Sequence, residues 1–194
     1  MRQARMKASG ELAGAYYHCV SRVVDRQFVF GDLERAKFVE LMRRWEQFCG
    51  VHVVTYCVMS NHFHILVEVP KPPETPPSDD DLLLRLEAAS GVMAAASLRQ
   101  TLQMLQAQCA PESLHEQRAA LRQTVLRRMW DVSQFMKALK QQFTQWFNRR
   151  HHRKGTLWEG RFASVLVEGA PQPCRTPASS PSAPPPHARG SPAL

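Results

Sequence analysis

The stretch MSNHFHILVEV, residues Met59–Val69, has the alternating pattern of a β-strand. Side chains along a strand point alternately to its two faces, so Phe63 and Ile65 share an apolar face that we expect to be buried. His62 and His64 share the other face, with their Cα atoms about 7 Å apart. Two imidazoles at this spacing can converge on one cation, and imidazole binds transition metals more readily than Mg²⁺. A strand surface on which histidine merely occurs twice gives the same pattern.

The segments on either side of this strand predict an α+β fold, from their apolar periodicity and turn residues. The expected elements are a strand over residues 15–24, a helix over 33–49, a strand over 51–58, the histidine strand over 62–69, a helix over 133–150 and a strand over 162–168. A helical insertion is expected at about 82–130, as two helices over 82–110 and 112–130 that Pro111 separates. The order β-α-β-β-α-β is typical of a ferredoxin-like domain, which we place at residues 12–168.

Two segments are too rich in proline for a strand or helix. Residues 71–81, KPPETPPSDDD, contain four prolines and an acidic run, and predict a linker or exposed loop. From residue 170 to the end there are eight prolines among 25 residues and no aromatic, Val, Ile or Met residue. Because such a segment buries too little apolar surface to order itself, residues 169–194 are predicted to be a disordered tail.

The net charge and the cysteine content indicate what kind of partner the protein binds and whether its thiols are reduced. A formal net charge of +8 and a pI near 9.7 favour a polyanionic partner, nucleic acid first, although charge alone is a weak signal. The five cysteines are scattered and form no CxxC pair, which predicts reduced thiols in a cytosolic protein. No signal peptide and no apolar run long enough to span a membrane is apparent.

A basic segment, RRHHRKGTLWEGR at residues 149–161, has five Lys or Arg side chains against one carboxylate. Cations that hold phosphates, with an aromatic ring that stacks on bases, fit single-stranded nucleic acid. The same charges also fit a solvated helix end, where they complement the helix dipole. Trp158 fits a core position as well as a stacking one. The candidate DNA contacts here are Arg149, Arg150, Arg153, Lys154, Trp158 and Arg161.

Taken together, YYHCVSRV, VTYCVMSNHFHILVEV and LKQQFTQWFNRRHHRKGTLWEGRF resemble the single-tyrosine HUH transposases. The nearest branch is the REP-associated one, related to insertion-sequence transposases, and the resemblance covers roughly residues 12–168. It implies a bacterial protein of DNA transposition that binds single-stranded or hairpin DNA and forms a homodimer. It also implies a place in the cytoplasm, at the nucleoid.

The resemblance assigns roles to the histidine strand. In that family the His-hydrophobe-His strand holds a divalent metal, Mg²⁺ or Mn²⁺, which polarises the scissile phosphate as a Lewis acid. Carried over, His62 and His64 are the metal ligands and Phe63 is the buried residue between them. Asn61 is expected to position the backbone or a phosphate, and Arg22 is a further candidate DNA contact.

The family's reaction also needs a tyrosine, whose phenolate attacks the phosphate. In the branch that this chain resembles, the tyrosine lies on a helix after the GTLWEGRF segment. This chain has only Tyr16, Tyr17 and Tyr56, all in expected strands. Other branches carry the nucleophile on the preceding helix, where this chain has Phe143, and aliphatic hydroxyls on that helix are poor substitutes for a phenol. The catalytic residue is therefore unknown.

The abrupt change of composition after Glu168 suggests that a frameshift has replaced the catalytic helix, although a natural disordered tail has a similar composition. Loss of a packed helix would expose apolar surface and promote association. Three functions follow from these expectations: a metal-dependent enzyme that nicks and transfers single DNA strands, a catalytically inactive module that still binds DNA hairpins, and a degenerate product that does neither.

Overall fold

A computed structural model of the chain describes residues 14–108 and 110–167. The predicted strands and helices of the core are confirmed, with bounds that shift by no more than two residues. The elements are β1 (Gly14–Arg22), the short 3₁₀ helix η1 (Val24–Arg26), α1 (Asp32–Cys49), β2 (His52–Val58), β3 (His62–Pro70), α2 (Asp79–Ser90), α3 (Val92–Gln108), α4 (Pro111–Leu126), α5 (Val132–Arg150) and β4 (Ala163–Val167).

The four strands form one antiparallel sheet in the order β2-β3-β1-β4. Two crossovers build it, β1-α1-β2 and β3-α5-β4, with the hairpin β2-β3 between them. This is the order expected of a ferredoxin-like α+β domain, which the structure confirms. Because β3 and β1 are the central pair, the histidine strand lies in the middle of the sheet.

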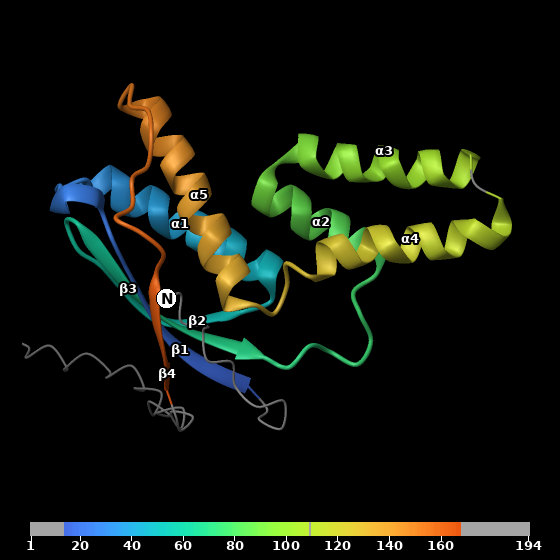
Figure 1. Ribbon diagram of the computed structural model, residues 1–194, viewed down its shortest axis with the longest axis horizontal. Coiled ribbons are helices and arrows are strands. Elements are labelled where there is room, and N and C mark those ends of the chain that lie inside the picture. Colours follow the sequence, from blue (N-terminus) through green and yellow to red (C-terminus); the bar gives the residue numbers. More distant parts are fainter. Residues whose placement is uncertain (1–13, 109, 168–194) are drawn as a thin grey trace, which may run out of the picture.

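Helices α1 and α5 cover one face of the sheet (Figure 1). Phe38 of α1 lies 4.7 Å from Phe63 of β3 between ring centroids, and 5.3 Å from Phe143 of α5. All three rings are fully buried. The Phe38–Phe143 pair is edge-to-face, with 83° between the ring planes, and such aromatic contacts add to the hydrophobic effect. The apolar face of the histidine strand is therefore fixed inward, which turns its histidines outward.

Gly50 ends α1 in a left-handed conformation, with φ of 63°. The position combines two demands that only glycine meets. L-residues with a side chain rarely adopt this φ, and a Cβ here would lie 2.8 Å from Nε1 of Trp130. Gly50 thus caps the C-terminus of α1, and the close approach of Trp130 ties the end of α1 to the segment that enters α5.

The insertion contains three helices, α2, α3 and α4, where the sequence predicts two. The expected long helix over 82–110 breaks at Gly91, which has φ of 91°. A residue with this φ cannot continue an α-helix, and an isolated glycine inside an apolar run did not reveal that. The predicted break at Pro111 is confirmed, since this proline occupies the first turn of α4. In Figure 1 helices α3 and α4 extend away from the sheet as an arm.

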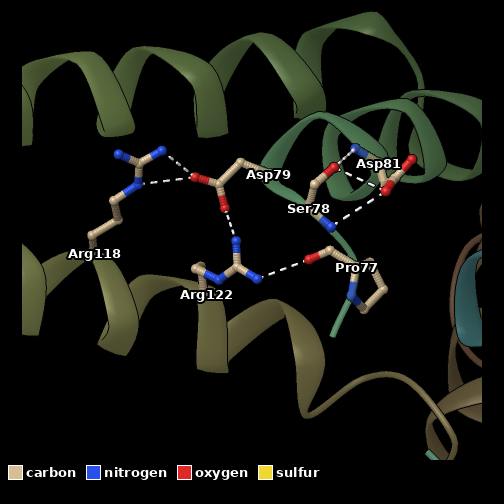
Figure 2. Close-up of polar contacts among 6 residues, drawn as sticks. All are labelled: Pro77, Ser78, Asp79, Asp81, Arg118 and Arg122. Atoms are coloured by element: carbon tan, nitrogen blue, oxygen red, sulfur yellow. Dashed lines mark hydrogen bonds and ion pairs between the residues drawn. The ribbon is translucent and has the colours of Figure 1, made fainter. Parts of the chain in front are cut away.

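A polar network joins the start of α2 to α4 (Figure 2). The Ser78 side chain caps α2 by accepting from the Asp81 amide. Asp79 accepts hydrogen bonds from the guanidinium groups of Arg118 and Arg122, and Arg122 also donates to the Pro77 carbonyl at 2.8 Å. Burial raises the pKa of Asp79, but the two arginines outweigh it and leave that pKa below its usual range. The arm is thus held to the start of α2 by an ionised carboxylate.

Several predictions fall on residues outside the described ranges. These are the disordered tail at 169–194, the frameshift after Glu168, and the outer limits of the domain at 12–168. Among the cysteines that the structure describes, Cys19, Cys49 and Cys57 form no disulfide. Within the same ranges, no helix combines the length and apolar character needed to cross a membrane.

Candidate metal and nucleic-acid site

The second face of the sheet carries the candidate site. In Figure 1 the described helices all lie on the side of α1 and α5, and none covers this second face, called here the open face. Alternation along β1 and β3 brings half-buried or exposed side chains to it. In the register of these strands Arg22 lies opposite His62, and Val20 lies opposite His64. Direct cross-strand partners have Cβ atoms about 5 Å apart, so the exposed Arg22 is an immediate neighbour of His62.

Asn61 fixes the orientation and the protonation of His62. Its Nδ2 donates to the Arg26 carbonyl at 3.1 Å. A carbonyl only accepts, so the amide group of Asn61 faces Arg26 and its Oδ1 faces His62, 2.7 Å from Nδ1. Oδ1 can only accept, so Nδ1 of His62 carries a proton and donates it. In the neutral ring Nε2 then holds the free lone pair, which is the one available to a metal.

The rings of His62 and His64 lie side by side, with centroids 5.2 Å apart and an interplanar angle of 70°. His64 has a further partner, since its Nδ1 lies 3.0 Å from Nε2 of His18 on β1. Burial, then the neighbouring His18 and His62, lower the pKa of His64. A lowered pKa favours the neutral imidazole, the form that ligates metals.

Sequence reasoning missed His18. The signal was present in the stretch AYYHCVSR, because His18 alternates with Arg22 onto the same face of the first strand. Its contact with His64 depends on the pairing register of β1 with β3, and neither strand shows that register by itself.

These residues fit a divalent ion only in part. Within the described ranges, no group of three or more His, Cys, Asp or Glu side chains is arranged to hold a metal ion. The strand supplies two imidazoles, so water or phosphate oxygens would have to complete the coordination. Such a mixed nitrogen and oxygen set fits Mn²⁺ better than Mg²⁺, which prefers oxygen ligands throughout.

The basic segment lies at the same end of the sheet as His62. The Glu159 amide donates to the Arg22 carbonyl at 3.0 Å, and Trp158 forms an isolated bridge with Val23. The segment therefore runs beside β1, two strand spacings or roughly 10 Å from β3. The predicted cations of this region that are exposed are Arg149, Arg150, Lys154 and Arg161.

Arg153 and Trp158 do not extend into solvent. The Arg153 guanidinium folds back over Phe147, 5.9 Å from its ring centroid, and donates to the Thr156 carbonyl at 3.4 Å. Trp158 is only 7% exposed, and its Nε1 donates to Thr144 Oγ1 at 2.8 Å. Of the two roles that the sequence allows for Trp158, the structure gives the core position. A buried ring cannot stack on a base, so the predicted stacking role is corrected.

No tyrosine of the described chain lies beside His62 and His64. Tyr17 is buried in the core, and Tyr56 is 39% exposed on β2, with the Arg43 guanidinium 5.5 Å from its ring. Tyr16 reaches the open face but lies opposite Glu68, four residues along β1 from the position opposite His64. Burial, then the Glu68 carboxylate, raise the pKa of Tyr16, which disfavours its phenolate.

Helix α5 supplies no substitute nucleophile at the site. Phe143 is fully buried, on the face of the sheet opposite to the two histidines. The Thr144 hydroxyl donates to the Lys140 carbonyl at 2.7 Å and accepts from Trp158, so its hydrogen bonds are already made. The site thus presents two imidazoles and a guanidinium, which are groups that could hold a metal and a phosphate, and no phenol among the described residues lies beside them.

Comparison with known proteins shows a similarity to one family of transposases. Residues 11–79 match the model of a transposase family described as IS200-like. A solved structure from Deinococcus radiodurans R1, described as a "putative transposase", is 14% identical, with a TM-score of 0.41 over 84% of this chain and 86% of that one. No protein of curated function matches the chain. The matched residues include the histidine strand, Asn61 and Arg22, so the similarity to IS200-like transposases covers the part of the chain that carries the candidate site.

Proposed function

We propose that this chain binds single-stranded or hairpin DNA at the end of the sheet that carries Arg22, Asn61 and His62. Transposases act on DNA, so the family makes DNA the expected partner. One observation carries the proposal: the exposed Arg22 guanidinium stands in direct register with His62 on the open face. A guanidinium recognises a phosphate through paired hydrogen bonds, and here it does so next to imidazoles that can hold a metal.

The proposal includes a divalent ion at His62 and His64. When bound, such an ion acts as a Lewis acid on a phosphate oxygen and holds that phosphate in place. The protein's part is orientation, since Asn61 holds the His62 ring with Nε2 outward. Outer hydrogen bonds of this kind fix the tautomer and the direction of a ligating histidine.

The paired histidines also favour a second candidate function, the nicking and strand transfer that the family performs. That reaction needs a phenolate at the phosphate, and Tyr16 lies about 13 Å along β1 from the position opposite His64. We therefore expect hairpin binding without a covalent product. Denaturing electrophoresis of the chain incubated with labelled hairpin DNA and Mn²⁺ tests this. A covalent adduct that disappears in Tyr16→Phe would establish the second candidate instead.

The exposed arginines at the end of α5 test the DNA-binding surface. We expect the double variant Arg149→Gln/Arg150→Gln to weaken hairpin binding in fluorescence anisotropy. The slope of log affinity against log salt should fall by about 0.7 for each phosphate contact that is lost.

A matched control separates a local contact from overall charge. Arg99 on α3 and Arg127 at the end of α4 are exposed and lie on the arm. The double variant Arg99→Gln/Arg127→Gln changes the net charge by the same amount and should leave the slope unchanged. Equal losses in the two double variants would show that the end of α5 is not the DNA surface.

A further inference from the structure

His18 has a place in the site that the paired histidines do not explain. It lies on β1, opposite Leu66 of β3 and Val165 of β4 in the strand registers. Its ring is half-buried and nearly parallel to that of His64, with an interplanar angle of 15° and 5.2 Å between centroids. Only 3.0 Å separates His18 Nε2 from His64 Nδ1. At this distance the two nitrogens share one proton in a hydrogen bond.

The direction of that hydrogen bond decides what His64 can do. If His18 donates, the proton of the neutral His64 ring is on Nε2, and both nitrogens of His64 are occupied. If His64 donates from Nδ1, its Nε2 keeps a free lone pair, and His18 carries its own proton on Nδ1. His62 already carries its proton on Nδ1 and has a free lone pair on Nε2, because Oδ1 of Asn61 can only accept from it.

We infer that His18 is a positioning residue, which accepts the Nδ1 proton of His64 and thereby leaves His64 Nε2 free for a divalent ion. The inference rests on the proposed metal function of His62 and His64. In that arrangement each ligand has its own acceptor, Asn61 for His62 and His18 for His64. Both rings are then fixed before any ion arrives, and each presents Nε2.

The arrangement also explains why a histidine stands at this position. Val20, the direct cross-strand partner of His64 on β1, offers no acceptor, and Cys57, its partner on β2, offers only a weakly accepting sulfur. His18 lies at the diagonal position, which is within reach of a long or aromatic side chain. Its apolar neighbours Leu66 and Val165 on the adjoining strands limit the directions that its ring can take.

The first test reads the tautomer directly in the full chain without metal. Long-range ¹H–¹⁵N correlation spectra, recorded at pH 8 with ¹⁵N-labelled histidine, distinguish a proton on Nδ1 from one on Nε2. We expect Nδ1–H for His64 in the wild type, and loss of that preference in His18→Phe. An Nε2–H tautomer of His64 in the wild type would overturn the inference, whether or not the chain binds metal.

The second test measures Mn²⁺ affinity by electron paramagnetic resonance. We expect His18→Phe to bind Mn²⁺ about 10–100-fold more weakly than the wild type, as for other lost outer partners of ligating histidines. His18→Gln should stay close to the wild type, because a glutamine oxygen can accept near the position of Nε2. Wild-type affinity in a folded His18→Phe variant would overturn the inference.

One control variant and two further readouts separate the possible failures. His52→Phe removes another exposed histidine, which lies opposite Glu68 and away from the site, and should leave Mn²⁺ affinity unchanged. If the wild type binds no Mn²⁺, the proposed metal function fails, while the tautomer of His64 still tests the hydrogen bond itself. If His18→Phe does not fold, the inference is tested by the tautomer of His64 in the wild type and by the Mn²⁺ affinity of His18→Gln.

Discussion

At the scale of single residues, the site depends on which nitrogen of each imidazole carries its proton. Asn61 settles this for His62, since its amide is itself oriented by the Arg26 carbonyl. An aspartate at the same place would also accept the proton, but it would add a negative charge close to a DNA phosphate bound at the proposed site. The neutral amide thus orients the ring without opposing DNA.

A residue-scale prediction concerns Lys140, which is 8% exposed and packs against the ring of Trp158. Burial lowers the pKa of Lys140 from 10.5 to about 8. The unfolded chain holds this proton up to near pH 10.5, so it binds more protons than the folded chain between pH 8 and 10.5. The free energy of unfolding should therefore rise with pH in that window.

The variant Lys140→Met isolates this effect. At pH 7 it should be about 1–3 kcal/mol more stable than the wild type in urea unfolding, because it avoids burying a charge. The lost hydrogen bond to the Gly160 carbonyl offsets part of this gain. The difference should shrink towards pH 10. Lys137→Met, an exposed lysine on the same helix, is the control, and a pH-independent difference for Lys140→Met would refute the argument.

At the scale of elements, the arm of α3 and α4 depends on few ties to the rest of the chain. The carboxylate of Asp79 is the hub of one of them, since it accepts from Arg118 and Arg122 on α4 (Figure 2). The pKa of Asp79 is lowered in the folded state, so this tie is present above its ordinary pKa and is lost as the pH falls through the lowered value.

We expect Asp79→Asn to loosen α4 without disturbing the sheet. The neutral amide cannot pair with two guanidinium groups, so hydrogen exchange of the α4 amides should become faster. Exchange in β3 should stay the same, because its core contacts involve α1 and α5. The exposed neighbour Asp80 gives the control variant Asp80→Asn. Unchanged exchange in α4 would show that the network is not what holds the arm.

The elements themselves were largely predictable from local pattern. Helices α1 and α5 have apolar positions at helical spacing, and apolar and polar residues alternate along the strands. Both types of element can therefore be recognised from a short stretch of sequence. The break at Gly91 was not predictable, because a lone glycine is tolerated inside many helices and only its φ of 91° shows that the chain turns there. The sequence does not distinguish a core position from a base-stacking position for Trp158, because a tryptophan suits both.

At the scale of the whole molecule, the sheet separates two tasks. One face, covered by α1 and α5, holds the aromatic core, and the open face holds the histidines and Arg22. Alternation along the strand predicted this division for His62 and His64. It could not predict that Arg22 and His18 join them, because those contacts follow from the pairing of β1 with β3 across more than forty residues of sequence.

The open face carries some of the exposed apolar surface that is expected if a packed helix is lost. Apolar side chains remain on it, and Val165 of β4 is 64% exposed. Exposed apolar surface next to charged groups is typical of a surface that meets a partner.

The most direct test of the account is Mn²⁺ binding by the full chain, compared between the wild type, His62→Ala and His64→Ala by electron paramagnetic resonance. The account predicts one Mn²⁺ site in the wild type and its loss in each variant, while the folded state persists because both side chains lie on the open face. Binding of equal strength in all three proteins, or none in the wild type, would contradict the assignment of a metal to these two histidines.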